Sequence, residues 1–364
     1  MVAGENGCAN AFSKYEELAS SLPASQQSLG SSPYRKYEGF WYPDHLLAPT
    51  LAMRDTFVAR PTDIILATTP KSGTTWLKAL GYCVVHRGHH APADERHPLL
   101  ASSPHDVVPF LHSIYENHRS ASPGPLLEEM PSPRVLAVHA PFTALLASVR
   151  ESACRVIYLC RDPKDAFVSL RHYLDEIKPE GSAMTPFAEA FILFCDGVSP
   201  FGPVWDNMAE YWKARPEKVM FLRYEDLKED AAGSVRRLAA FLGCLFTGEE
   251  AERGVPMAIL ELCSMDKMRS VEANRDGMHR NDHLSIKNSA FFRKGEVGDW
   301  KAHMTLDMAR RLDGIVEQKL RGSGLSMIGS SMCGSGVDRL LLFQMCHASV
   351  VSIWHIWASA PICL

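Results

Sequence analysis

The sequence predicts an α/β fold: a single domain in which helices flank a central parallel sheet. Two observations predict this fold class. Four short apolar segments, typical of strands buried on both faces, alternate with segments whose apolar residues recur at helical spacing. Polar side chains follow each apolar segment directly, as they do at the carboxyl edge of an open parallel sheet. The 364 residues are 46% hydrophobic, which suffices for a large core without disulfides or metals.

The first strand and helix are joined by a turn that suits the binding of an anion. Residues 64–67 (IILA) form the strand, and the helix begins near Thr75. Between them, Gly73 lets the backbone approach an anion closely, and Lys71 adds a full charge beside the N–H groups of the helix N-terminus. Further donors are the hydroxyls of Ser72, Thr74 and Thr75. We therefore predict a P-loop-like strand–loop–helix that holds an anionic group.

Further strands and helices follow in alternation. The remaining strands are predicted at 134–138, 155–160 and 219–223. The remaining helices are predicted at 163–173, 185–195, 204–215, 231–242, 247–262 and 305–320. Asp162 is expected to cap one helix, and Thr247 with Glu250 forms a capping box for another. Residues 87–133 are rich in loops, which often shape substrate entrances, and residues 274–300 are polar and irregular.

Composition changes near both ends divide the chain into three parts. Residues 1–34 are rich in Ser, Ala, Gly and Gln, which is typical of a mobile arm. Residues 35–326 form the predicted folded domain. Residues 327–364 form an atypical tail that is hydrophobic, without formal charge, from residue 340. A genuine tail, a membrane anchor and a mis-spliced terminus all stay open, although Gln344 and two histidines dilute the hydrophobicity and disfavour a membrane span.

Charge and cysteine usage argue against several classes of function. The chain has 38 basic and 42 acidic residues, a formal net charge of −4, so no overall basic field favours nucleic acid. The ten cysteines are scattered without a C-x-x-C pair, and the N-terminus lacks a signal-peptide pattern, which favours reduced thiols and a cytoplasmic location. Four histidines lie close together in the sequence, namely His86, His89, His90 and His97. No cysteine or carboxylate stands at a metal-ligand spacing from them. We therefore predict that they are solvated, and we expect no metal site.

Chemistry-bearing residues are expected at five places that the fold would bring together. Four follow strand ends, namely the turn at 71–75, His139, Arg161 and Tyr224. The fifth is a basic pair beside a glycine on a later loop, at 293–295. One anion-binding turn and a second basic set would suit a nucleotide with two separated anionic groups.

This pattern differs from a nucleoside-triphosphate site. The P-loop signature G-x-x-x-x-G-K-S/T places its lysine after the second glycine, whereas Lys71 precedes Gly73. An acidic Mg²⁺ ligand is also missing after the third strand, where Arg161 stands. We therefore expect Lys71 to supply positive charge directly, in place of a metal.

At these residues the chain resembles the cytosolic sulfotransferases, most clearly their soluble plant branch, whose acceptors include flavonols, steroids and hydroxylated jasmonates. The resemblance covers about residues 34–326. Four segments carry it, and they are TTPKSGTTW (68–76), YLCRDPKDAFVSL (158–170), FLRYEDLKED (221–230) and RKGEVGDWK (293–301). It implies transfer of sulfonate from 3′-phosphoadenosine 5′-phosphosulfate (PAPS), as co-substrate, to a hydroxyl of a small acceptor, without a metal.

The resemblance also implies residue roles. His139 would be the general base, worth about 10²–10⁴-fold in rate, and Lys71 would stabilise the leaving phosphate. The loop around the 5′-phosphosulfate would be formed by Lys71, Ser72, Gly73, Thr74 and Thr75. The 3′-phosphate would be held by Arg161, Ser169, Arg293, Lys294 and Gly295. The adenine would be contacted by Trp76, Tyr224, Cys263 and Met265.

Several points concern the acceptor and the departures from the family. The acceptor is expected to be phenolic, steroid-like or jasmonate-like, in a pocket that includes Phe40, Trp41 and Phe142. Ala137 stands where animal members commonly have a second active-site lysine. Arg310 replaces an acid of the family's dimerisation segment, so a monomer or a weak homodimer is expected. A P-loop-like small-molecule kinase and a catalytically impaired nucleotide-binding relic are the alternatives.

Overall fold

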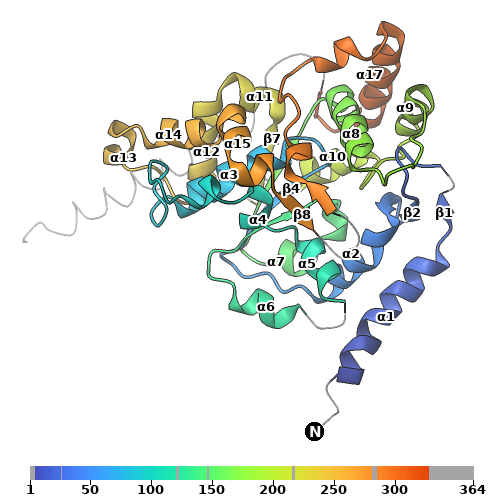
Figure 1. The fold of residues 1–364 in the computed structure, drawn as a ribbon, viewed down its shortest axis with the longest axis horizontal. Helices are drawn as coiled ribbons and strands as arrows, with labels where there is room; N and C mark the ends of the chain where they lie inside the picture. The colour runs from blue at the N-terminus through green and yellow to red at the C-terminus, as the bar shows by residue number, and fades with distance from the viewer. Residues whose placement is uncertain are drawn as a thin grey trace, which may run out of the picture. The chain divides into compact units, whose positions relative to one another are not determined.

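The centre of the computed structural model is a parallel sheet of four strands in the order β5-β4-β6-β7. Figure 1 labels β4 and β7 of this sheet, with helices around them. The strands are β4 (Ile64–Thr68), β5 (Val135–Val138), β6 (Arg155–Cys160) and β7 (Val219–Arg223). All run in the same direction, with Ile64 paired to both Val135 and Arg155. The fold class and all four strands are thus confirmed. Because the strands are parallel, the residues that follow them lie along one edge of the sheet.

Alternating residues of each strand face two separate hydrophobic cores. Ile65 and Ala67 of β4 belong to one cluster, whereas Ile64 and Leu66 belong to the other. The first cluster is covered by α2 (Asp44–Thr56), α8 (Pro163–Ile177), α10 (Val204–Lys213) and α17 (Leu306–Leu320). The second is covered by α3 (Thr74–His86), α12 (Ala231–Phe241) and α14 (Val255–Leu262). The near-continuous apolar strands follow from burial on both faces.

The structure describes residues 5–327 apart from residues 26, 120–122, 146, 215–217 and 281–284. The tail predicted beyond residue 327 therefore lies outside the described residues. Met327 itself is buried, and its Sδ lies 4.0 Å from Sγ of Cys160. In the part described, none of the helices is both long and apolar enough to cross a membrane.

Shorter elements connect the layers. The helices among them are α4 (Pro104–Val107), α5 (Leu111–Asn117), α6 (Gly124–Glu129), α7 (Ala147–Glu151), α9 (Phe187–Cys195), α11 (Tyr224–Glu229), α13 (Gly248–Glu252), α15 (Met265–Ser270) and α16 (Glu272–Arg275). Outside the central sheet lie the strands β1 (Ala24–Ser25), β2 (Tyr34–Tyr37), β3 (Phe40–Pro43), β8 (Met278–Arg280) and β9 (Ser285–Lys287). Asp162 caps α8 as predicted, accepting a hydrogen bond from the N–H of Lys164.

The N-terminal segment differs from the predicted mobile arm. Residues Glu5–Ser21 form helix α1, which packs against α2. Phe12, Tyr15 and Ala19 are buried in the first core cluster, and their spacing places them on one face of the helix. This apolar stripe is narrow and lies within a Ser- and Ala-rich composition, which explains the wrong prediction.

Two further predictions need correction. The helix expected over 247–262 is two helices, because Gly254 adopts φ +70° and breaks it, although the predicted capping box of Thr247 and Glu250 is confirmed. His97, expected to be solvated, is buried. Its Nδ1 accepts a hydrogen bond from the N–H of Leu99 at 3.2 Å, and its Nε2 lies 3.8 Å from Sγ of Cys83. These two contacts satisfy its ring nitrogens inside the core.

Candidate active site

The turn between β4 and α3 has an unusual backbone. Gly73, the N-cap of α3, adopts φ +104°, and Lys71 adopts φ +66°. A Cβ atom at position 73 would lie only 2.7 Å from Cδ2 of Tyr224, so only glycine fits there. Gly73 also provides no side-chain cap for the first N–H groups of α3. An unusual backbone at a helix N-terminus is typical of anion-binding turns.

The hydroxyls of this turn already have protein partners. Thr74 Oγ1 lies 2.7 Å from Oγ1 of Thr68, and Ser72 Oγ lies 2.7 Å from Oγ1 of Thr69. Thr75 Oγ1 lies 3.0 Å from Nε2 of His105. The Ser72 side chain is fully buried, so it orders the turn from within. A hydroxyl has both a donor and acceptor positions, so the half-buried Thr75 can still bind a ligand although it already has a partner.

Three cations gather beside this turn. Lys71 Nζ lies 4.4 Å from the ring centroid of Tyr173 and 3.5 Å from the carbonyl oxygen of Ala290. Burial, followed by the charges of Arg293 and Arg161, lowers the pKa of Lys71 to about 7. Arg161 donates to the carbonyl oxygens of Lys71 at 3.4 Å and Glu296 at 2.6 Å. Asp165 lies 3.6 Å from Arg161 and partly offsets its charge, but both guanidinium groups still act as positive charges on Lys71, which favours an anion there.

One carboxylate fixes the loop that carries the second basic set to α8, and another stabilises this loop internally. Asp165 of α8 accepts hydrogen bonds from the N–H groups of Gly298 at 2.7 Å and Trp300 at 2.9 Å. Asp299 accepts from Arg293 and Lys294, each at 2.6 Å. Burial alone would raise the pKa of Asp299, but the hydrogen bonds from these two cations lower it to about 2.

Two guanidinium nitrogens of this set lack partners. Nε of Arg161 and Nε of Arg293 are buried and have no hydrogen-bond partner among the described residues. Ser169, the third polar residue predicted here, is buried on α8. Buried donors without partners are costly, so these two nitrogens suit a bound anion.

An aromatic group lies beside the cations. The rings of Trp76 and Tyr224 lie 5.7 Å apart at 71°, and Tyr224 Oη donates to the carbonyl oxygen of Gly295 at 2.9 Å. A Cβ at Gly295 would lie 2.5 Å from Cε of Met265, so Met265 also contacts this group. Cys263 is fully buried in the second core cluster, with its Sγ 3.6 Å from Sγ of Cys83.

His139 directly follows β5, next to the turn. Its Nδ1 lies 2.8 Å from the carbonyl oxygen of Thr68, so Nδ1 carries the hydrogen and donates it. Burial, and then the charges of Lys78 and Lys71, lower the pKa of His139 to about 3 despite the opposing hydrogen bond to Thr68. At neutral pH the ring is therefore uncharged, and Nε2 has a free lone pair.

The aromatic surroundings of His139 include residues that the sequence did not single out. Ring centroids of Phe110, Phe201 and His112 lie 4.6, 5.6 and 6.0 Å from that of His139. Phe110 reaches this place because its backbone bridges to Ala137 of β5, and residues 87–133 gave only the general signal of a substrate-shaping loop.

The three residues predicted to line the acceptor pocket have their described contacts with residues other than His139. Phe40 is buried in the first core cluster, and the ring of Phe142 lies 5.4 Å from that of Tyr211. Trp41 exchanges backbone hydrogen bonds with residues 201 and 202, each at 2.7 Å, and so helps to position Phe201. Their part in an acceptor pocket stays a prediction.

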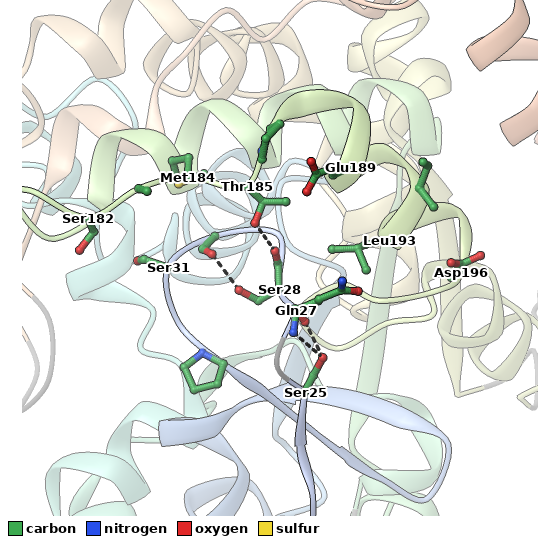
Figure 2. Close-up of a pocket in the computed structure, with 15 residues that line it drawn as sticks. Ser25, Gln27, Ser28, Ser31, Ser182, Met184, Thr185, Glu189, Leu193 and Asp196 are labelled. Carbon is green, nitrogen blue, oxygen red and sulfur yellow. Dashed lines mark hydrogen bonds between the residues drawn. The ribbon is translucent and has the colours of Figure 1, made fainter.

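A cavity of about 950 Å³ is lined by residues of two segments, and these are Ser25, Gln27, Ser28, Gly30, Ser31, Pro33, Ser182, Ala183, Met184, Thr185, Pro186, Glu189, Ile192, Leu193 and Asp196 (Figure 2). Its hydroxyls pair locally, with Thr185 Oγ1 donating to the carbonyl oxygen of Ser28 at 2.7 Å. None of its lining residues belongs to the loops that follow the central strands. The cavity is therefore separate from the candidate active site.

A parallel sheet with a cationic turn and basic loops at its carboxyl edge defines an α/β protein that binds anionic ligands. The chain belongs to the sulfotransferase family, because the family model described as sulfotransferase domain matches residues 61–324. It is therefore a sulfotransferase enzyme, and the predicted family and enzyme class are confirmed.

Relatives of this chain include plant proteins and solved structures. Cytosolic sulfotransferase 13 of Arabidopsis thaliana is 40% identical over 85% of this chain and 92% of its own length. A crystal structure of an Arabidopsis protein, described provisionally as a steroid sulphotransferase, is 34% identical, with a TM-score of 0.67 over 85% of this chain and 94% of that chain. A mouse sulfotransferase was solved as a complex with PAP (3′-phosphoadenosine 5′-phosphate). It is 27% identical, with a TM-score of 0.62 over 80% of this chain and 95% of that chain.

Proposed function

We propose that this enzyme transfers the sulfonate group of PAPS to a hydroxyl of a small organic acceptor. Support for the donor comes from the mouse relative, whose structure was solved with PAP. Support for the residues comes from the sheet edge, where the turn around Lys71 adjoins His139, Arg161 and Tyr224 at successive strand ends. The location would be cytosolic, as the names of the plant relatives state for those proteins.

The residues present fit a ligand with two anionic groups. The α3 N-terminus and Lys71 would hold the 5′-phosphosulfate. The unpartnered Nε atoms of Arg161 and Arg293 would bind the 3′-phosphate, together with Ser169, Lys294 and the backbone of Gly295. The Trp76–Tyr224 group, Met265 and, from the core, Cys263 would form the surroundings of the adenine.

In the transfer itself, His139 and Lys71 would have separate roles. His139 would accept the acceptor's hydroxyl proton at Nε2, because Nδ1 is already committed to Thr68. Lys71 would stabilise the charge that develops on the leaving 5′-phosphate. Its pKa of about 7 in the free protein would rise beside that anion, so the ammonium would be charged when it is needed.

The acceptor would be small and largely apolar. Phe110 and Phe201 surround His139 with aromatic faces, which suit a phenolic, steroid-like or jasmonate-like alcohol. Phe40, Trp41 and Phe142 would extend this pocket, Trp41 by positioning Phe201. We expect a monomer or a weak homodimer, with no metal, nucleic acid or membrane partner.

One observation carries this proposal: an uncharged His139 with a free Nε2 stands at the same sheet edge as the Lys71 turn. The test incubates the full chain with PAPS labelled in its sulfonate and a panel of phenols, sterols and hydroxylated fatty-acid derivatives. We expect label in at least one acceptor. Tight PAP binding without transfer to any acceptor would instead favour the impaired relic, and phosphoryl transfer from ATP would favour the kinase.

A further inference from the structure

A buried lysine lies one turn along α3 from the candidate anion-binding turn. Lys78 has no solvent-exposed surface, and its Nζ lies 3.4 Å from the ring centroid of Phe110. Its Nζ also lies 3.1 Å from Nδ1 of His105. A fully buried amine is expensive to maintain, so a lysine at this position calls for a specific reason.

His105 connects this amine to the turn. It is buried on α4, and its ring lies 4.0 Å from that of Phe291, centroid to centroid. Its Nε2 lies 3.0 Å from Oγ1 of Thr75, the second residue of α3. Lys78, His105 and Thr75 therefore form one continuous chain of polar contacts, which runs from the core to the N-terminus of α3.

The hydrogen bonds that join Lys78, His105 and Thr75 have a preferred direction. Burial, and then the charge of Lys78, lower the pKa of His105 well below its ordinary value, so the imidazole is neutral and carries a single N–H. Burial likewise lowers the pKa of Lys78, which Asp106 opposes. As an ammonium, Lys78 can only donate to Nδ1, and the single hydrogen of His105 then resides on Nε2 and is donated to Thr75 Oγ1. As a neutral amine, Lys78 could also accept from Nδ1, but the position of Nζ, 3.4 Å from the ring centroid of Phe110, favours the charged, donating state.

This direction determines where the hydrogen of Thr75 can point. With its oxygen already accepting from His105, the Thr75 hydroxyl keeps its own hydrogen for a different partner. The position of Thr75 in the first turn of α3 makes an anion at the helix N-terminus that partner. The opposite tautomer would make Thr75 donate to His105 and would remove this donor.

We propose that Lys78 and His105 are positioning residues, which hold the Thr75 hydroxyl as a hydrogen-bond donor to the anionic phosphosulfate or phosphate group bound at the α3 N-terminus. The inference rests on the proposed function for the identity of that group. It adds two residues, from α3 and α4, that touch neither donor nor acceptor but act through Thr75.

Other charged groups surround the row of polar contacts formed by Lys78, His105 and Thr75. The ring of His279, on β8, lies 6.0 Å from that of His105, and its Nδ1 lies 3.8 Å from Oδ1 of Asp106 on α4. Lys71 and His139 also contribute to the lowered pKa of His105. The substitutions used in the test leave all four of these residues in place.

The test is a double-mutant cycle between Lys78→Met and Thr75→Val, measured on the full chain by kcat/KM with PAPS and by the Kd of PAP. A donor to a charged group is typically worth about 10-fold to 100-fold, so Lys78→Met should lower kcat/KM and raise the Kd of PAP, each by about 10-fold, in the parent. In the Thr75→Val background the same substitution should have little effect, because its target hydroxyl is gone. Equal losses in both backgrounds, or no loss in the parent, would overturn the inference.

A matched pair at His105 covers the case in which Lys78→Met fails to fold. In His105→Gln the amide nitrogen can take the place of Nε2 and donate to Thr75, whereas the side chain of His105→Asn is too short. We expect His105→Gln to retain several-fold more PAP affinity than His105→Asn at equal thermal stability. Equal affinities would contradict the inference. Failure of the proposed function is recognised separately, because the unsubstituted enzyme would then not transfer sulfonate, while the PAP readout still tests the chain.

Discussion

The lowered pKa of Lys71 predicts a steep pH dependence of donor binding. In the free protein this pKa is about 7, because burial and the neighbouring guanidinium groups disfavour the charged amine. A bound anion restores the charge and raises the pKa, so binding takes up a proton above pH 7. The affinity for PAP should therefore fall as the pH rises.

The size of this effect follows from the two pKa values. Each pH unit above the free pKa costs about tenfold in affinity until the pKa of the complex is reached, so a complex in which Lys71 regains its ordinary pKa of 10.5 gives about 50-fold between pH 7 and pH 9. The window starts at pH 7 because the phosphates of the ligand, with a second pKa near 6, are ionised above it. Calorimetry in buffers of different ionisation enthalpy measures both the affinity and the proton uptake, which should be about 0.9 at pH 8.

Lys71→Arg is the matched control, since its guanidinium stays charged throughout the window. Its PAP affinity should be nearly independent of pH between 7 and 9. A flat profile in the parent, or the same slope in Lys71→Arg, would refute the attribution to Lys71.

Three further predictions concern other parts of the site. Gly73→Ala should weaken PAP binding at least tenfold in a calorimetric titration, because the new Cβ meets the Tyr224 ring and the positive φ is strained; unchanged affinity would contradict the tight approach at this turn. Asp299→Asn should lower the free energy of unfolding by about 2 kcal/mol at pH 7, in urea titrations. The folded pKa of Asp299, about 2, lies below its ordinary 3.8, so this stabilisation is complete above about pH 5 and lost as the pH falls toward 2; a difference that persists at pH 2 would argue against the ion pairs as its source. Phe201→Ala should raise the KM for the acceptor about tenfold and leave the Kd of PAP unchanged, whereas a loss confined to PAP binding would place Phe201 outside the acceptor pocket.

The sheet and its edge could be predicted from the sequence because both depend on local patterns. The apolar runs at 64–68 and 155–160 are buried on both faces, and the residues that follow them need only the parallel geometry to meet. Helix α1 was missed because its apolar face, at Phe12, Tyr15 and Ala19, becomes significant only through packing against α2.

The contacts between distant segments could not be predicted from the sequence. Lys78 appears on a helix pattern as one more polar residue, and only the packing of α4 against α3 places His105 at its amine. Phe110 and Phe201 likewise come to His139 from segments that have no periodicity of their own. Such contacts are determined by tertiary packing, which a single sequence does not display.

The most direct test of the central proposal compares His139→Ala with the parent enzyme in two assays, sulfonate transfer from labelled PAPS and the Kd of PAP. His139 is proposed to act only on the acceptor hydroxyl, so transfer should fall by about 10²–10⁴-fold while the Kd of PAP stays within about twofold. Transfer at a near-parental rate in His139→Ala would contradict the account, since another group would then have to take the proton.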